Sequence, residues 1–113
     1  MTEALVKGVG IGKNVVTGKV SICVSPEDYH AKVHRGDIVV VPGLDDEFVS
    51  FVANHAAAII TEEGGLTSAG AIVAITLKLT VVVGAEGAIS TLKDGQIVTV
   101  DPRTGFIYEG SAE

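Results

Sequence analysis

The sequence has 113 residues, of which 47% are hydrophobic and only 4% aromatic, and its formal net charge is −6. This length predicts a single domain over residues 1–113, with a core of Val, Ile, Leu and Ala. The eight basic residues are dispersed, which excludes a basic stripe for nucleic acid or anionic lipid. No apolar run approaches the roughly 20 residues of a membrane helix, and no secretory signal precedes the first strand. We therefore expect a cytoplasmic protein with neither nucleic-acid nor membrane partners.

Glycines alternate with apolar residues over Leu5–Gly12, and Val15–Val24 then has the composition of a strand. A dinucleotide-binding fingerprint would require these glycines to open a helix, whereas a strand pattern follows them. A phosphate-binding P-loop needs Ser or Thr after its Gly-Lys pair, but Val20 follows Lys19. The segment therefore predicts bends and bulges in antiparallel β-structure.

Ser25-Pro26-Glu27-Asp28 has the composition of a helix start, and the helix should end at His34-Arg35-Gly36. His30 and His34 are four residues apart, which would place them on one helical face as half of a metal site. No cysteine or carboxylate cluster completes such a site, so two solvent-facing histidines are the favoured interpretation. Cys23 is the only cysteine, which excludes an intramolecular disulfide.

Two short apolar strands follow, Asp37–Pro42 and Ala56–Thr61, with a helix between them that begins at Asp45 or Asp46. The acidic residues Asp45-Asp46-Glu47 could be read as cation ligands. Three acids in a first helical turn are explained more simply as complements to the helix dipole. We therefore assign no metal to this segment.

The most informative stretch is Gly64-Gly65-Leu66-Thr67-Ser68, which joins the strand ending at Thr61 to an apolar helix. Free backbone N–H groups at a helix start, together with two hydroxyls, favour an oxyanion such as phosphate or sulfate. We therefore predict anion-binding residues Gly64, Gly65, Thr67 and Ser68. Thr67 acting only as a helix cap remains the alternative, and Glu62 and Glu63 would weaken anion binding.

The remaining chain alternates short elements. Strands are predicted at Val81–Val83, Gln96–Val100 and Phe106–Glu109, with a helical turn over Ala88–Leu92 and tight turns at Lys93-Asp94-Gly95 and Asp101–Gly105. The tail from Gly110 is expected to be loose. Alternating strands and helices with antiparallel ends predict an α/β fold with a mixed sheet, and ligands in such folds bind at the carboxyl ends of parallel strands.

The run Thr61–Val73, followed by Val81-Val82-Val83-Gly84, resembles the mobile phosphohistidine domain of phosphoenolpyruvate-utilising enzymes. The likeness is nearest to the extra C-terminal domain of bacterial pyruvate kinases. It implies a swivelling β/β/α domain with helices packed on a mixed sheet. In catalytic members of the family, the residue after Thr-Ser is a histidine that carries a phosphoryl group.

Here that position is Ala69, and a methyl group cannot accept a phosphoryl group. The resemblance therefore implies no catalytic residue in this chain. A second departure is Lys78-Leu79-Thr80, where the family usually has Gly-Ile-Pro before its strand. That change affects the turn between helix and strand rather than the fold.

Three functions stay open at this point. The first is a non-catalytic domain of a pyruvate kinase with a structural, interaction or regulatory role, whose partners are other domains or subunits of that enzyme. The second is a weak phosphate- or phosphometabolite-binding module at the Gly64–Ser68 stretch. The third is a phosphoryl-carrier domain whose histidine was replaced by engineering. No cofactor is expected for this domain; the resemblance implies Mg²⁺ and a monovalent cation only for a parent pyruvate kinase.

Overall fold

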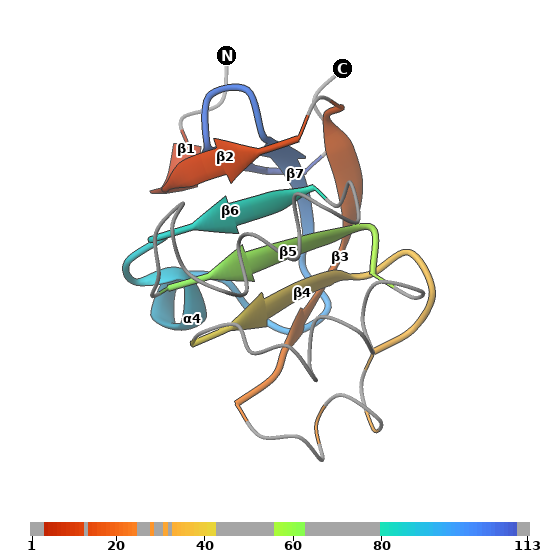
Figure 1. Cartoon of the computed structure of the whole chain (residues 1–113). Helices are drawn as coiled ribbons and strands as arrows, with labels where there is room; N and C mark the ends of the chain where they lie inside the picture. The colour runs from red at the N-terminus through yellow and green to blue at the C-terminus, as the bar shows by residue number, and fades with distance from the viewer. Residues whose placement is uncertain are drawn as a thin grey trace.

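The structure is a computed structural model that describes residues 4–12, 14–24, 28, 31, 33–42, 56–62 and 80–110. Eight strands within these ranges form one continuous sheet in the order β1-β8-β7-β3-β4-β5-β6-β2. The strands are β1 (Ala4–Lys7), β2 (Val9–Ile11), β3 (Val16–Ile22), β4 (Ile38–Val41), β5 (Ala58–Thr61), β6 (Val81–Val83), β7 (Ile97–Asp101) and β8 (Phe106–Glu109). Figure 1 shows β4, β5 and β6 side by side at the centre of the molecule.

The sheet is mixed, as the alternating sequence predicted. The neighbouring pairs β3–β4, β4–β5 and β5–β6 are parallel, whereas β2, β7, β8 and β1 join through antiparallel pairs. Every residue of β4, β5 and β6 is buried. Their continuous Val, Ile and Ala runs are therefore explained by coverage on both faces, which is typical of parallel strands.

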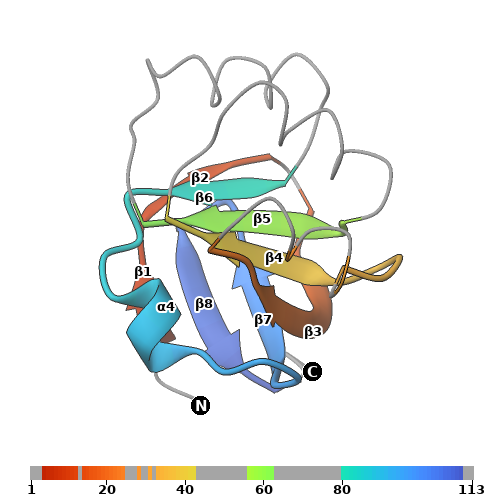
Figure 2. The same cartoon turned by 90° about the horizontal axis from the view of Figure 1, so that it is seen from below.

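Strand β3 belongs to two layers of the fold. Its first half pairs antiparallel with β7, from Val16 opposite Val100 to Lys19 opposite Ile97. Its second half pairs in parallel with β4, beginning at Val20 opposite Ile38. Burial changes at the same point, from alternating positions to consecutive buried ones at Val20 and Ser21. Figure 2 shows the two layers, with β2, β6, β5 and β4 in one and β1, β8 and β7 in the other.

The glycine-rich start of the chain closes the opposite side of this two-layered structure. Only Gly8 separates β1, which pairs with β8, from β2, which pairs with β6. The Gly8 N–H donates to the Gly105 carbonyl at 2.9 Å, and a Cβ on Gly10 would collide with the Pro102 carbonyl. The predicted β-bulge segment is confirmed, including a register irregularity near the start of β1. The glycines permit close backbone approach rather than nucleotide binding.

The one helix whose bounds fall in the described ranges is α4 (Ala88–Thr91), at the predicted helical turn. Asp28 and Ala31 are helical, and a turn at Arg35 and Gly36 follows, in agreement with the predicted helix end. The helices predicted after Asp45 and after Thr67 lie outside the described residues.

The turns at Lys93–Gly95 and Asp101–Gly105 are confirmed. The prediction of a loose tail is wrong for Gly110, because its N–H donates to the Ile97 carbonyl at 2.7 Å and its own carbonyl accepts from the Thr99 hydroxyl at 2.7 Å.

The core lies between the two layers and draws on both. It contains Val6, Val20, Ile38, Val40, Ala58, Ile60, Val82, Ala85, Ala88, Leu92, Val98, Val100 and Ile107. Among the described residues, this cluster contains no aromatic side chain, in agreement with the composition. Register pairs Ala4 with Tyr108, so the first and last strands lie side by side.

Candidate functional site

The carboxyl ends of the three central parallel strands lie together, because Val41 of β4 is in register with Thr61 of β5 and β6 pairs with β5 on its other side. The predicted anion-binding stretch begins three residues after Thr61. The predicted binding residues Gly64, Gly65, Thr67 and Ser68, together with Ala69, lie outside the described residues. What the structure describes is the framework that precedes them.

Thr61 and Glu62 connect the end of β5 to its neighbours. The Thr61 hydroxyl donates to the Pro42 carbonyl at 3.3 Å, and the Glu62 N–H donates to the Val41 carbonyl at 3.1 Å. On the other side, the Ala85 N–H donates to the Thr61 carbonyl at 2.9 Å. These bonds fix the backbone from which the Gly64–Ser68 stretch continues.

The Glu62 side chain also has a structural partner. Its Oε2 accepts a hydrogen bond from the Ile89 N–H at 3.2 Å, in the first turn of α4. This turn has no side-chain cap from its own N-cap residue, Gly87. Glu62 therefore satisfies a backbone donor that a short helix leaves unpaired, and that donor offsets part of its charge.

A second polar cluster surrounds Asp37 at the amino end of β4. Asp37 is 4% exposed, and its Oδ2 accepts from the Ser21 hydroxyl at 2.7 Å and from the His34 N–H at 3.0 Å. His34 Nδ1 lies 3.8 Å from the same oxygen. Charge-assisted hydrogen bonds of this kind compensate for burial of a carboxylate. Because Ser21 donates to Asp37 rather than to the imidazole, the three residues do not form a nucleophilic triad.

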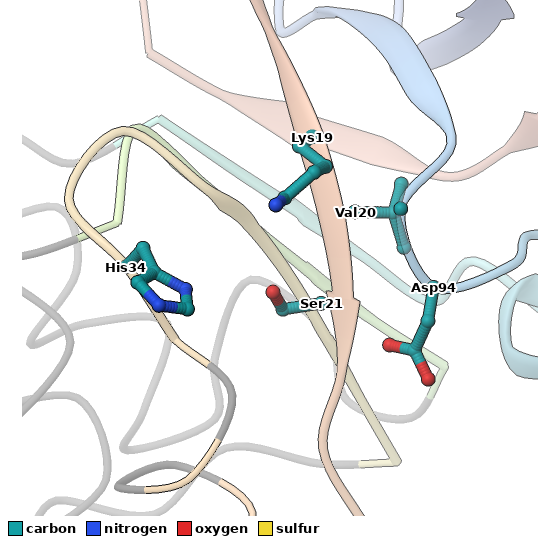
Figure 3. A pocket seen from close by; sticks show the side chains of 6 residues that line it. Lys19, Val20, Ser21, His34 and Asp94 are labelled. Atoms are coloured by element: carbon teal, nitrogen blue, oxygen red, sulfur yellow. The ribbon is translucent and has the colours of Figure 1, made fainter.

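An open pocket lies beside this cluster, at the junction of the two layers. It is lined by Lys19, Val20 and Ser21 of β3, by His34, and by Asp94 and Gly95 of the turn before β7. Figure 3 shows the Lys19 side chain extending toward the space between Ser21 and His34. Asp94 Oδ1 accepts from the Ile22 N–H at 2.7 Å, and this turn therefore anchors to β3.

No group of three or more His, Cys, Asp or Glu that could hold a metal ion occurs among the described residues. His34 is exposed, as predicted, whereas His30 and the acidic run Asp45–Glu47 lie outside the described part. Cys23 is buried and forms no disulfide. Within the described ranges, no helix is long and apolar enough to cross a membrane.

Sequence reasoning missed the roles of Glu62 and Asp37. Glu62 reaches a helix 27 residues further along the chain, which no local pattern indicates. Asp37 offered one signal, an acid placed between the Gly36 turn and a fully apolar strand. A carboxylate at the edge of a buried strand requires hydrogen-bond donors, but the sequence does not say that Ser21 supplies one.

The two-layered mixed sheet and the strand-end position of the glycine motif define a mobile-domain fold of the phosphoenolpyruvate-utilising type. The family model "PEP-utilising enzyme, mobile domain" matches residues 33–105, which is more than half of the chain. The chain therefore belongs to this family, and the resemblance seen in the sequence is confirmed.

Relatives of known activity include two kinds of enzyme. The chain is 42% identical over 106 residues to a pyruvate kinase of Lactobacillus delbrueckii subsp. bulgaricus, covering 94% of this chain and 18% of the relative. It is 41% identical to a pyruvate kinase of Geobacillus stearothermophilus, covering 99% of this chain and 19% of the relative. A phosphoenolpyruvate synthase of Aeropyrum pernix is 39% identical, and the match covers 98% of this chain and 13% of the relative. The chain thus spans less than a fifth of the relatives it matches.

Solved structures support the fold. The match to an NMR structure of Enzyme I covers 70% of this chain and 32% of the Enzyme I chain, with a TM-score of 0.59 and 28% identity. The match to aconitase X of Thermococcus kodakaraensis covers 94% of this chain and 98% of the aconitase X chain, with a TM-score of 0.70. The identity to aconitase X is 23%, so that likeness concerns the fold alone.

Proposed function

We propose that this chain is a non-catalytic mobile-type domain of a pyruvate kinase, with a structural, interaction or regulatory role beside the other domains or subunits of that enzyme. The parent enzyme would transfer a phosphoryl group from phosphoenolpyruvate to ADP in a separate domain. The matches to pyruvate kinases support this parent, although the phosphoenolpyruvate synthase match is almost as high.

The observation that carries the proposal is Ala69. In the catalytic family members that the motif resembles, the residue after Thr-Ser is the phosphoryl carrier, so alanine at this position supports a non-catalytic role. No other histidine replaces it in the motif, because His30, His34 and His55 all lie elsewhere in the sequence. His34 lies at the amino end of β4, whereas the motif follows the carboxyl end of the neighbouring strand β5.

Two assays test this function. In the first, the isolated chain is supplied with phosphoenolpyruvate, ADP, Mg²⁺ and K⁺, and pyruvate formation is followed; we expect none. In the second, the chain is added to a pyruvate kinase from which the homologous domain has been removed. Recovery of the thermal stability or of the oligomeric state of the truncated enzyme supports a docking role. Unchanged behaviour of the truncated enzyme, with saturating chain present, argues against it.

A second candidate function is weak binding of phosphate, sulfate or a phosphorylated metabolite at Gly64, Gly65, Thr67 and Ser68. Two hydroxyls and a helix start remain in the sequence after loss of the histidine. Glu62 and Glu63 precede the motif and would repel an anion. The hydrogen bond from the Ile89 N–H to the Glu62 carboxylate favours this candidate, because it offsets part of that negative charge. A phosphate titration followed by amide shifts tests it: shifts at Thr67, Ser68 and Ala69 are expected, and their absence at millimolar phosphate removes the candidate.

We further propose that the domain works in the cytoplasm and needs no cofactor of its own. Any Mg²⁺ and monovalent cation would bind the catalytic domain of the parent enzyme. The acidic composition and the dispersed basic residues support the absence of nucleic-acid partners.

A further inference from the structure

The pocket at the junction of the two layers has features that the proposed function does not use. Lys19 is exposed on β3 and forms no ion pair with any described residue, although its side chain extends over the pocket toward His34. The chain carries a net charge of −6, so a pocket that places a lysine without a described ion-pair partner beside a histidine differs from its mostly acidic charge. These two side chains come from different elements and converge on the same space (Figure 3).

The neighbours of His34 determine what the pocket can hold. Asp37 Oδ2 lies 3.8 Å from His34 Nδ1. The carboxylate itself is buried and already accepts hydrogen bonds from the Ser21 hydroxyl and the His34 N–H. Asp94, the other acid of the lining, accepts a backbone hydrogen bond from Ile22. Both negative charges are thus partly offset, and among the described residues no ion pair engages Lys19.

We propose that this pocket binds small oxyanions, held between the Lys19 ammonium group and the His34 imidazole. The ligand class comprises carboxylates and phosphoryl or sulfuryl groups, which share the acceptor oxygens that these donors require. The site lies at the amino end of β4 and is distinct from the predicted Gly64–Ser68 site, which follows the carboxyl end of β5. Affinity is expected to be in the millimolar range, because the pocket is open and two carboxylates lie nearby.

The test is an amide-shift titration of the isotope-labelled chain with sulfate and, separately, with acetate. Sulfate represents tetrahedral oxyanions, whereas acetate represents carboxylates. Saturable shifts are expected at Lys19, Ser21, His34 and Gly95. Lys19→Gln should weaken binding about fivefold, the effect of one charge at contact distance. His34→Ala should also weaken binding, because it removes the imidazole N–H donor.

Lys7→Gln is the matched control, because it removes the same charge at a position where Lys7 lies over the Phe106 ring. It should leave the affinity at the pocket unchanged. The proposal would be overturned by an absence of saturable shifts at the pocket, or by equal weakening in Lys7→Gln and Lys19→Gln. Shifts confined to Thr67, Ser68 and Ala69 would also overturn it, while supporting the second candidate function. Shifts at the pocket without shifts at the motif would support the pocket and remove the second candidate function.

Discussion

The Glu62 carboxylate accepts a hydrogen bond from the Ile89 N–H at 3.2 Å, which connects the end of β5 to the first turn of α4. Glu62 immediately precedes Glu63-Gly64-Gly65 in the sequence, so the residue that stabilises α4 also fixes the start of the glycine motif. Glu62→Ala should lower the free energy of unfolding by about 1 kcal/mol, the usual contribution of a hydrogen bond to a partly exposed charged group. Chemical denaturation measures this loss.

Glu62→Gln separates hydrogen bonding from charge at this position. The glutamine amide oxygen can still accept from Ile89, so at least half of the stability lost in Glu62→Ala should be retained. Glu109→Gln serves as the control, since Glu109 is exposed at the end of β8. A loss in Glu62→Ala no larger than that in the control would show that the carboxylate does not stabilise α4.

The buried Asp37–Ser21 pair should be more costly to break. Asp37→Ala removes the acceptor of the buried Ser21 hydroxyl and of the partly buried His34 N–H. We expect destabilisation of roughly 2–3 kcal/mol, because two hydrogen bonds to a charged group are lost. Ser21→Ala leaves the carboxylate one hydrogen bond short and should cost roughly 1 kcal/mol less. Thermal unfolding of both variants beside Glu109→Gln measures the order, and the reverse order would contradict the assignment of Asp37 as the centre of the cluster.

The closure of the two layers depends on Gly10. A Cβ at this position would collide with the Pro102 backbone, and β2 would have to move away from the turn between β7 and β8. Gly10→Ala should therefore destabilise the domain by about 3 kcal/mol. Gly36→Ala is the comparison, since its φ of +90° is strained for alanine but no atom lies within 4 Å of the new Cβ. That variant should lose only about 1 kcal/mol. Equal losses would show that strand closure does not require the close approach at Gly10.

The interaction between Asp101 and Arg103, in the turn between β7 and β8, predicts how the stability of the domain changes with pH. A side-chain hydrogen bond from Arg103 is the main cause that lowers the pKa of Asp101 below the ordinary aspartate value. The folded state therefore binds this proton less readily than the unfolded state. The resulting stability is present above the unfolded-state pKa of about 3.9 and is lost as pH falls through the lower folded-state value.

Arg103→Ala should remove this contribution. Because Arg103 is largely exposed, the difference from the unmodified chain should be below about 1 kcal/mol near neutral pH. It should shrink toward zero under strongly acidic conditions. Urea denaturation across the acidic range tests the sign; a difference that grows on acidification would contradict it.

Much of the fold could be predicted because its signals are local. The strands β4, β5 and β6 follow from continuous apolar runs, and the turns at Lys93–Gly95 and Asp101–Gly105 follow from their own residue types. The sharing of β3 between two layers could not be predicted, since it depends on two partners far apart in the sequence, β7 and β4. The same reason explains why only the structure showed that Gly10 lies against Pro102.

The candidate sites show the same division. The glycines and hydroxyls of the anion motif indicate its place in the sequence, and family membership is now established, while the binding residues themselves stay a prediction. The Lys19–His34 pocket could not be predicted, because its lining comes from three separated segments. Basic residues that are dispersed in the sequence indicate no anion-binding surface, yet β3 and the turn before β4 bring the Lys19 and His34 side chains into one pocket.

The central claim, loss of the phosphoryl carrier at Ala69, is tested most directly by phosphoryl transfer from labelled phosphoenolpyruvate. The chain and its Ala69→His variant are incubated separately with the phosphoenolpyruvate-binding part of a family enzyme, whose own mobile domain serves as the positive control. With that control labelled, we predict no acid-labile phosphate on the unmodified chain. Label on Ala69→His alone would show that the Gly64–Ser68 motif still supports phosphoryl transfer once histidine is restored. Acid-labile phosphate on the unmodified chain would contradict the claim and identify a carrier at another residue.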